Sequence, residues 1–169
     1  KQVFTMLGLS HAQLGNCVES VKSLTAAVSM GVIDKIVFNQ LGTCQYKNKE
    51  YVSAIESLSR AINAGINTKE VFLYKGYSEV IQKDNDNAIN DLEKAVALGA
   101  NEREAFKNLG DLYFIKNDFQ AAVKNYDRAI AAGMNDAVVF NNRGKAKSNL
   151  KEFQGSVPDF DQAIQLKPD

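Results

Sequence analysis

Apolar side chains recur along the chain at the three- and four-residue steps that are typical of amphipathic helices. In residues 104–116 the apolar positions that share one face are Phe106, Leu109, Leu112 and Tyr113. In residues 120–132 they are Val123, Tyr126 and Ile130. Asn117 and Asp118 lie between the two stretches and suit a turn followed by a helix N-cap. The pattern predicts two helices joined by a short turn, which must pack as antiparallel neighbours.

The same two-helix pattern recurs with a period of 34 residues. Each repeat carries a glycine in its first helix, a phenylalanine four positions earlier and an alanine nineteen positions later. The glycines are Gly8, Gly42, Gly76, Gly110 and Gly144. The three columns predict a single array of ten helices, without strands or a second domain, divided into repeats 1–34, 35–68, 69–102, 103–136 and 137–169.

A glycine inside a helix costs roughly 1 kcal/mol relative to alanine, so Gly110 needs a compensating role. We expect Gly110, Ala122 and Ala129 to lie where the two helices of the fourth repeat cross closely, with aromatic rings buried around the crossing. Other glycines are expected to end the second helices as C′ residues: Gly31, Gly65, Gly99 and Gly133. The expected N-caps of the helices that follow them are Asp34, Thr68, Asn101 and Asn135.

These columns resemble the tetratricopeptide repeat family, whose pattern is W-x2-L-G-x2-Y, then A-x3-F, then P, at a period of 34. The fourth repeat matches as Phe106-x2-Leu109-Gly110-x2-Tyr113, then Ala122-x3-Tyr126. The resemblance covers the whole chain. It implies an all-α fold, a right-handed α-solenoid of five antiparallel helix pairs whose first helices line a concave groove. It also implies a protein-binding role without chemistry of its own.

The chain departs from the family pattern in two kinds of position. Phenylalanine replaces the tryptophan throughout, and the proline near the end of each repeat occurs only as Pro168. Lys75 and Arg143 replace the leucine that the other repeats carry. Either their stems cover apolar surface while the charges reach solvent, or those two repeats pack more loosely.

Pro158 falls in the last expected helix. Because proline is tolerated only in the first turn of a helix, we expect this helix to begin late, near Ser156 or Val157.

Charge and composition narrow the function. Twenty basic residues balance twenty acidic ones, so no net field attracts nucleic acid or an anionic membrane. No apolar run approaches the ~20 residues of a membrane helix, and no targeting segment is visible. We expect a soluble protein of the cytoplasm or periplasm, with the compartment itself unknown. The chain begins at Lys1 and its ends fall on repeat boundaries, which is typical of a fragment of a longer array.

Candidate chemistry is scarce. Cys17 and Cys44 form neither a CxxC motif nor a metal-ligand cluster, which favours two free thiols over a disulfide. His11 takes the position of Tyr113, which favours a packing role. No side chains show a catalytic spacing, no glycine loop suits a phosphate, and residues 83–87 lack the spacing of a calcium loop. We therefore expect no enzyme, no metal site and no cofactor.

The expected groove is the remaining candidate site. Its face is predicted from the fifth, sixth and ninth positions of each repeat, and the candidate binding residues are Asn39, Leu73, Tyr74, Tyr77, Lys107, Asn108, Asp111, Asn141, Asn142 and Lys145. The apolar members in the third repeat suit an extended or helical partner segment lying across repeats three and four. Tyr46 and Phe114 either face such a ligand or wedge between adjacent helices.

Some members of the family hold the C-terminal carboxylate of chaperones with lysines and asparagines. Lys107 and Asn142 fall at two such positions, but Asp111 stands where that clamp has an asparagine. No sixth repeat supplies the remaining basic residues, so the resemblance implies that this clamp is absent.

Two functions stay open. The first is a scaffold that binds a protein or peptide in the groove. The second is an assembly module without a separate ligand, which self-associates through apolar surface at the end of the array. Ile164 and Leu166 are expected to be exposed there.

Overall fold

The structure is a computed structural model that describes residues 1–167. Those residues form ten α-helices and no strand. The helices are α1 (Gln2–Gln13), α2 (Cys17–Ser29), α3 (Lys35–Lys47), α4 (Tyr51–Asn63), α5 (Lys69–Gln82), α6 (Asn85–Ala97), α7 (Arg103–Ile115), α8 (Phe119–Ala131), α9 (Ala137–Asn149) and α10 (Phe153–Leu166). The prediction of an all-α repeat fold is confirmed, and the helices of the fourth repeat begin and end within one residue of their predicted bounds.

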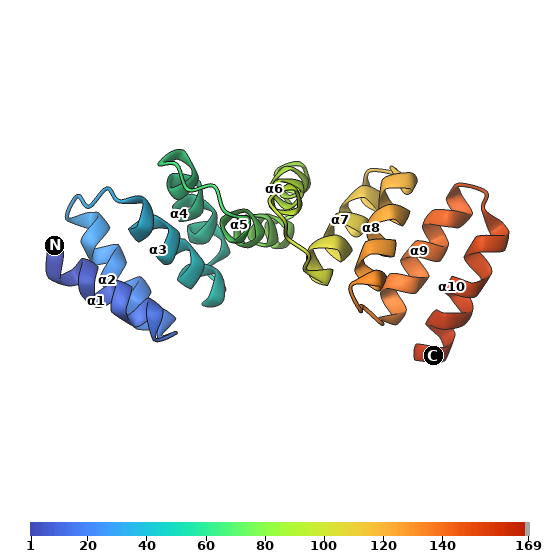
Figure 1. Cartoon of the computed structure of the whole chain (residues 1–169), viewed down its shortest axis with the longest axis horizontal. Coiled ribbons are helices and arrows are strands. Elements are labelled where there is room, and N and C mark those ends of the chain that lie inside the picture. Colours follow the sequence, from blue (N-terminus) through green and yellow to red (C-terminus); the bar gives the residue numbers. More distant parts are fainter. Residues whose placement is uncertain (168–169) are drawn as a thin grey trace. The chain divides into compact units, whose positions relative to one another are not determined.

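The helices form two compact units, Lys1–Gly99 and Ala100–Asp169. In the first unit α1 packs on α2, α3 on α4 and α5 on α6, and each later pair also packs on the second helix of the pair before it (Figure 1). In the second unit α7 packs on α8 and α9 on α10, and α8 also contacts α9. None of the ten helices combines the length and the apolar character that crossing a membrane requires.

The ends of the helices show why the chain turns where it does. The four C′ glycines have φ between +83° and +96°, a left-handed conformation that favours glycine. At the first of them the amide of Val32 donates to the carbonyl of Ala27, which is a Schellman stop. Asp34 and Asp136 cap α3 and α9 by accepting bonds from backbone amides. The N-caps of α7 and α9 are Glu102 and Asp136, so the expected Asn101 and Asn135 are wrong by one residue.

Gly110 lies at a close crossing of α7 and α8, as predicted. A Cβ atom at this position would lie 2.6 Å from Cδ1 and Cε1 of Tyr126. Ala122, Tyr126 and Ala129 on α8 are fully buried. The missing side chain therefore allows the tyrosine ring to occupy the space between the two helices.

Pro158 lies inside α10, which begins at Phe153. The expectation of a late start near Ser156 or Val157 is wrong. Pro158 lacks the N–H that would bond to the carbonyl of Gln154. Both residues are exposed, so the helix continues through the proline at a place where its surface is open to solvent.

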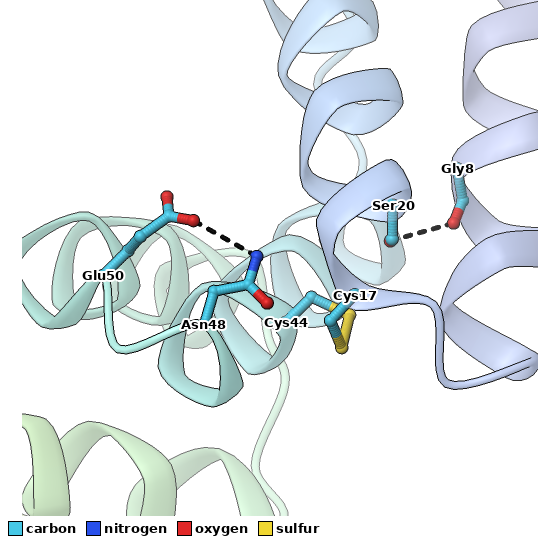
Figure 2. Close-up of a disulfide and its surroundings, with 6 residues drawn as sticks. All are labelled: Gly8, Cys17, Ser20, Cys44, Asn48 and Glu50. Atoms are coloured by element: carbon cyan, nitrogen blue, oxygen red, sulfur yellow. Dashed lines mark hydrogen bonds between the residues drawn. A yellow bond between two sulfur atoms is a disulfide. The ribbon is translucent and has the colours of Figure 1, made fainter.

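A disulfide joins Cys17, the first residue of α2, to Cys44 on α3 (Figure 2). The two Cα atoms are 4.8 Å apart, although 27 positions separate the residues in the sequence. The expectation of two free thiols is wrong. It considered only the spacing along the chain, whereas packing of α2 on α3 brings the two positions together.

Candidate functional site

The first unit carries four of the predicted binding residues, Asn39 on α3 and three on α5. Asn39, Tyr74 and Tyr77 are partly exposed. Leu73 is only 5% exposed, so its predicted place on an exposed platform is wrong. The reason is that α5 packs against α3, α4 and α6 and leaves little of its surface free.

Four tyrosines gather in the first unit, and we call them the tyrosine cluster: Tyr46, Tyr51, Tyr74 and Tyr77. The ring centroid of Tyr46 lies 5.0 Å from that of Tyr74 and 6.2 Å from that of Tyr77. Tyr51, the first residue of α4, meets Tyr46 edge to face at 5.9 Å. All four side chains are partly exposed. Tyr46 therefore both packs between helices and contributes to the surface, so the two alternatives for it are not exclusive.

The repeat pattern of the sequence contains a signal for the pairing of Tyr51 with Tyr46. Two repeats (68 residues) later, Phe114 and Phe119 occupy the positions of Tyr46 and Tyr51. The centroids of their two rings lie 5.5 Å apart. An aromatic residue at the end of the first helix, paired with one at the start of the second, is thus a feature that the second and fourth repeats share.

Asp111 organises the candidate residues of the second unit. Its Oδ1 accepts hydrogen bonds from the Tyr126 hydroxyl at 2.7 Å and from Nδ2 of Asn142 at 3.1 Å. Its Oδ2 accepts a bond from Nζ of Lys107 at 2.7 Å. The carboxylate therefore ties α7 to both α8 and α9. Burial, with the negative charge of Asp111, raises the pKa of the Tyr126 hydroxyl, so this group stays protonated and donates.

This arrangement changes the charge that the second unit presents. Because Asp111 neutralises Lys107, that ammonium is not an unpaired receptor for a ligand carboxylate. Lys145 is exposed, and Asn108 and Asn141 are partly exposed. The surface thus combines amides and one exposed ammonium with an internal ion pair.

The two cations that replace leucine do not extend into solvent. Lys75 pairs with Glu79 on its own helix and with Asp91 on α6. Arg143 on α9 pairs with Asp159 on α10. Burial opposes the charged form of Lys75, but its bonds to Asp91 and Glu79 outweigh burial and raise its pKa. The expectation that these charges reach solvent is therefore wrong, because both cations end in ion pairs within the protein.

A repeat-to-repeat correlation in the sequence predicts these pairs. Sixteen positions after the leucine or cation, the three leucine repeats carry a neutral polar residue: Ser23, Ser57 and Asn125. The two cation repeats carry an aspartate there: Asp91 and Asp159. Charge at one position therefore accompanies the opposite charge at the other.

Glu79 gives the stability of the first unit a dependence on pH. The side chain is 1% exposed and its Oε2 has no hydrogen-bond partner. Burial, with the charge of Asp91 and against the bond from Lys75, raises the pKa of the Glu79 carboxyl from 4.5 to about 7. A carboxyl with a raised pKa stabilises the fold when it is protonated, and this contribution is lost as pH rises through the folded pKa.

We therefore expect Glu79→Gln to remove a pH dependence between about 4.5 and 7. Below this window wild type and variant should differ by a constant amount. As pH rises to about 7, wild type should lose about 3 kcal/mol relative to the variant, because only wild type must ionise a buried group. Urea denaturation of both proteins across this range measures the difference. A difference that stays constant with pH contradicts the assignment.

Other candidate chemistry is limited among residues 1–167. His11 is partly buried, in keeping with packing. No three His, Cys, Asp or Glu side chains in this part of the chain form a group that could hold a metal ion.

The fold is shared with solved repeat proteins. One crystal structure of MamA is 17% identical with a TM-score of 0.79, over 99% of this chain and 91% of that one. A second, MamA AMB-1, is 20% identical with a TM-score of 0.85, over 98% and 91%. YrrB, described as a TPR protein with an unusual peptide-binding site, is 17% identical with a TM-score of 0.81, over 98% and 86%. At these identities the likeness shows the fold alone.

The sequence itself decides the family. No curated protein matches the chain. A family profile described as Tetratricopeptide repeat matches residues 5–67 and 75–137, and a second profile of the same description matches residues 137–169. Together they cover nearly every repeat identified from the glycine, phenylalanine and alanine columns. The chain belongs to the tetratricopeptide repeat family, whose members are protein-interaction repeats.

Proposed function

We propose that the chain is a scaffold that binds a segment of a partner protein, with the tyrosine cluster as its anchor. The observation that carries this proposal is that three partly exposed rings, from α4 and α5, lie within ring-contact distance of the partly exposed Tyr46 on α3. Tyrosine combines a large apolar face with a polar tip, and such residues dominate the binding energy of many interfaces.

The neighbouring groups on α3 suit an extended backbone. Asn39, Gln40 and Thr43 are partly exposed and uncharged. Their amides and hydroxyl supply both donors and acceptors, which an extended segment needs for its unpaired N–H and C=O groups. The partner segment is therefore proposed to place an apolar or aromatic side chain on the rings and its backbone along α3.

The second unit offers a polar surface to the same kind of partner. Asn108, Asn141 and Lys145 present amides and an ammonium. Because Lys107 is already paired with Asp111, this surface supports recognition of backbone amides better than capture of a terminal carboxylate.

The test begins with segments selected from a peptide display library on the wild-type chain. Their dissociation constants are then measured on the purified variant Tyr74→Ala/Tyr77→Ala. We expect binding to weaken by about tenfold or more, because removing an anchor from an interface commonly costs more than 1 kcal/mol. Circular dichroism checks that the variant keeps its helices.

The matched control is Phe153→Ala, which removes an aromatic side chain that is 62% exposed on α10, a second helix of its repeat. It should leave binding unchanged. Selected segments that bind the double tyrosine variant with unaltered affinity would show that the tyrosine cluster is not the site.

Self-association is a second proposed function, supported by the surface between α9 and α10. A groove of about 500 Å³ is lined by Ala137, Val138, Asn141, Phe160, Ala163, Ile164 and Lys167. Ile164 is 59% and Leu166 37% exposed, as predicted. Such an apolar patch favours contact with another protein surface.

We expect the sedimentation coefficient of the chain to rise with concentration, and Ile164→Lys to suppress the rise by placing a charge in the groove. Sedimentation velocity over a concentration series measures both proteins. A wild-type chain that remains monomeric throughout contradicts this second function.

A further inference from the structure

The disulfide lies at the junction between the first helix pair and the second. Cys17 begins α2 and Cys44 lies on α3, so the bond crosses from one repeat to the next (Figure 2). The Cys17 and Cys44 side chains are 8% and 2% exposed. The disulfide is therefore a covalent link inside the packed interface between α2 and α3 and does not lie on the surface.

The first pair is internally well joined. The hydroxyl of Ser20 donates to the carbonyl of Gly8 at 2.9 Å, and both groups are buried (Figure 2). A Cβ atom at Gly8 would lie 2.5 Å from Cδ2 of Leu24, which shows how closely α1 and α2 cross. Because of these contacts, we expect α1 and α2 to move together as one helix pair.

The contacts from this pair to the rest of its unit are fewer. Beyond each other, α1 and α2 pack only on α3. The apolar cluster at this junction is centred on Leu24, Val37 and Leu41. Only Gly8 is buried on α1, whereas six residues are buried on α3.

The first repeat also lacks the ring pair that closes the turn in two other repeats. Where those repeats place Tyr46 with Tyr51 or Phe114 with Phe119, the first repeat has Ala12 and Cys17. At the start of the second helix, the first repeat therefore has a half-cystine bonded to Cys44 where the second and fourth repeats have an aromatic ring.

We propose that the Cys17–Cys44 disulfide is a redox-controlled lock on this junction. In the oxidised chain α1 and α2 are held against α3. In the reduced chain the pair opens from α3 as a unit, while α4, α5 and α6 keep their structure. Opening exposes Val37 and Leu41, which the oxidised junction covers.

The chemistry is a thiol–disulfide exchange. A dithiol reductant gives two electrons and two protons, becomes a cyclic disulfide and leaves Cys17 and Cys44 as thiols. Because both side chains are buried, the attacking thiolate reaches the bond only when the junction opens transiently. Reduction is therefore expected to be slow in the native state and to accelerate with mild denaturant.

Amide hydrogen exchange read by mass spectrometry tests the lock on the chain of residues 1–169. We compare the oxidised protein, the protein reduced with dithiothreitol, and the variant Cys17→Ser/Cys44→Ser. Exchange in α1 and α2 should be at least about tenfold faster in the reduced protein and in the variant, because the cross-link no longer restrains the open state. Exchange in α4 to α10 should not change. The variant with dithiothreitol controls for the reductant and should match the variant alone.

Three outcomes overturn the proposal. Exchange that rises equally in every helix would make the disulfide a contributor to global stability and not a local lock. Exchange in α1 and α2 that is unchanged on reduction would show that apolar packing alone holds the junction. Two reactive thiols in the denatured, unreduced chain would show that the bond does not form.

Discussion

Replacing Asp159 with alanine is expected to lower the free energy of unfolding by about 3 kcal/mol. Asp159 is 3% exposed and accepts from Nε of Arg143 at 3.0 Å, and Nζ of Lys147 lies 2.9 Å from its Oδ2. The variant would leave two largely buried cations without this carboxylate, and an uncompensated buried charge is costly. Urea denaturation followed by circular dichroism measures the loss.

The chain supplies a matched control in Asp127→Ala. Asp127 also bonds to Arg143, at 2.7 Å, but its side chain is 53% exposed. Removing it should cost less than about 1 kcal/mol, because an exposed pair is weak in water. Equal losses for Asp127→Ala and Asp159→Ala would contradict the importance of burial.

A second comparison separates the cost of leaving buried cations unpaired from the net contribution of the ion pairs to stability. The triple variant Arg143→Leu/Lys147→Gln/Asp159→Ser copies the residues that the second repeat carries at these positions. Its stability should lie closer to that of wild type than that of Asp159→Ala does, because all three charges are removed together and none is left buried without a partner. A triple variant as unstable as Asp159→Ala would show that the ion pairs themselves stabilise the last repeat.

Replacing Gly110 with leucine is expected to destabilise the chain by about 3 kcal/mol, at the upper end of the cost of overpacking. A Cβ atom there would lie 2.6 Å from two ring atoms of Tyr126. That ring cannot easily move, because it is fully buried and its hydroxyl is bonded to Asp111. Thermal and urea denaturation measure the effect.

Lys124→Ala on the exposed side of α8 is the control and should change stability by no more than about 0.5 kcal/mol. A double-mutant cycle with Tyr126→Ala refines the test. If the leucine clashes with the ring, the combined loss will be smaller than the sum of the two single losses. Additive losses, or an unchanged melting temperature for Gly110→Leu, contradict the close crossing.

Much of the fold follows from the sequence because its causes are local and periodic. The glycine at a helix crossing, the alanine columns of the second helix and the C′ glycines each impose a backbone or packing requirement that recurs every 34 residues. Residue type alone favours Asn101 and Asn135 as caps. The period counted from Asp34 leads instead to Glu102 and Asp136, which the structure confirms.

The candidate site was harder to predict because side-chain exposure depends on neighbours in space. Leu73 and Tyr74 are consecutive, yet only the leucine is buried. The position of Asp111 in the repeat did not reveal that it would hold Tyr126 and Asn142, since no other repeat has a hydroxyl at the position of Tyr126. Cys17 and Cys44 became partners only through the packing of α2 on α3.

The buried ion pairs also bear on how a chain of similar repeats avoids misassembly while it folds. Helices of one repeat resemble those of the next, so a first helix has several second helices with which it can form a compact but incorrect pair. If α5 paired with the second helix of another repeat, Lys75 would face Ser57 or Asn125 in place of Asp91 and would keep only Glu79 on its own helix as a counter-ion. In the third and fifth repeats, the cation–aspartate pairs thus disfavour pairing of the first helix with the second helix of a neighbouring repeat. They favour the correct pairing of helices while the array is still folding.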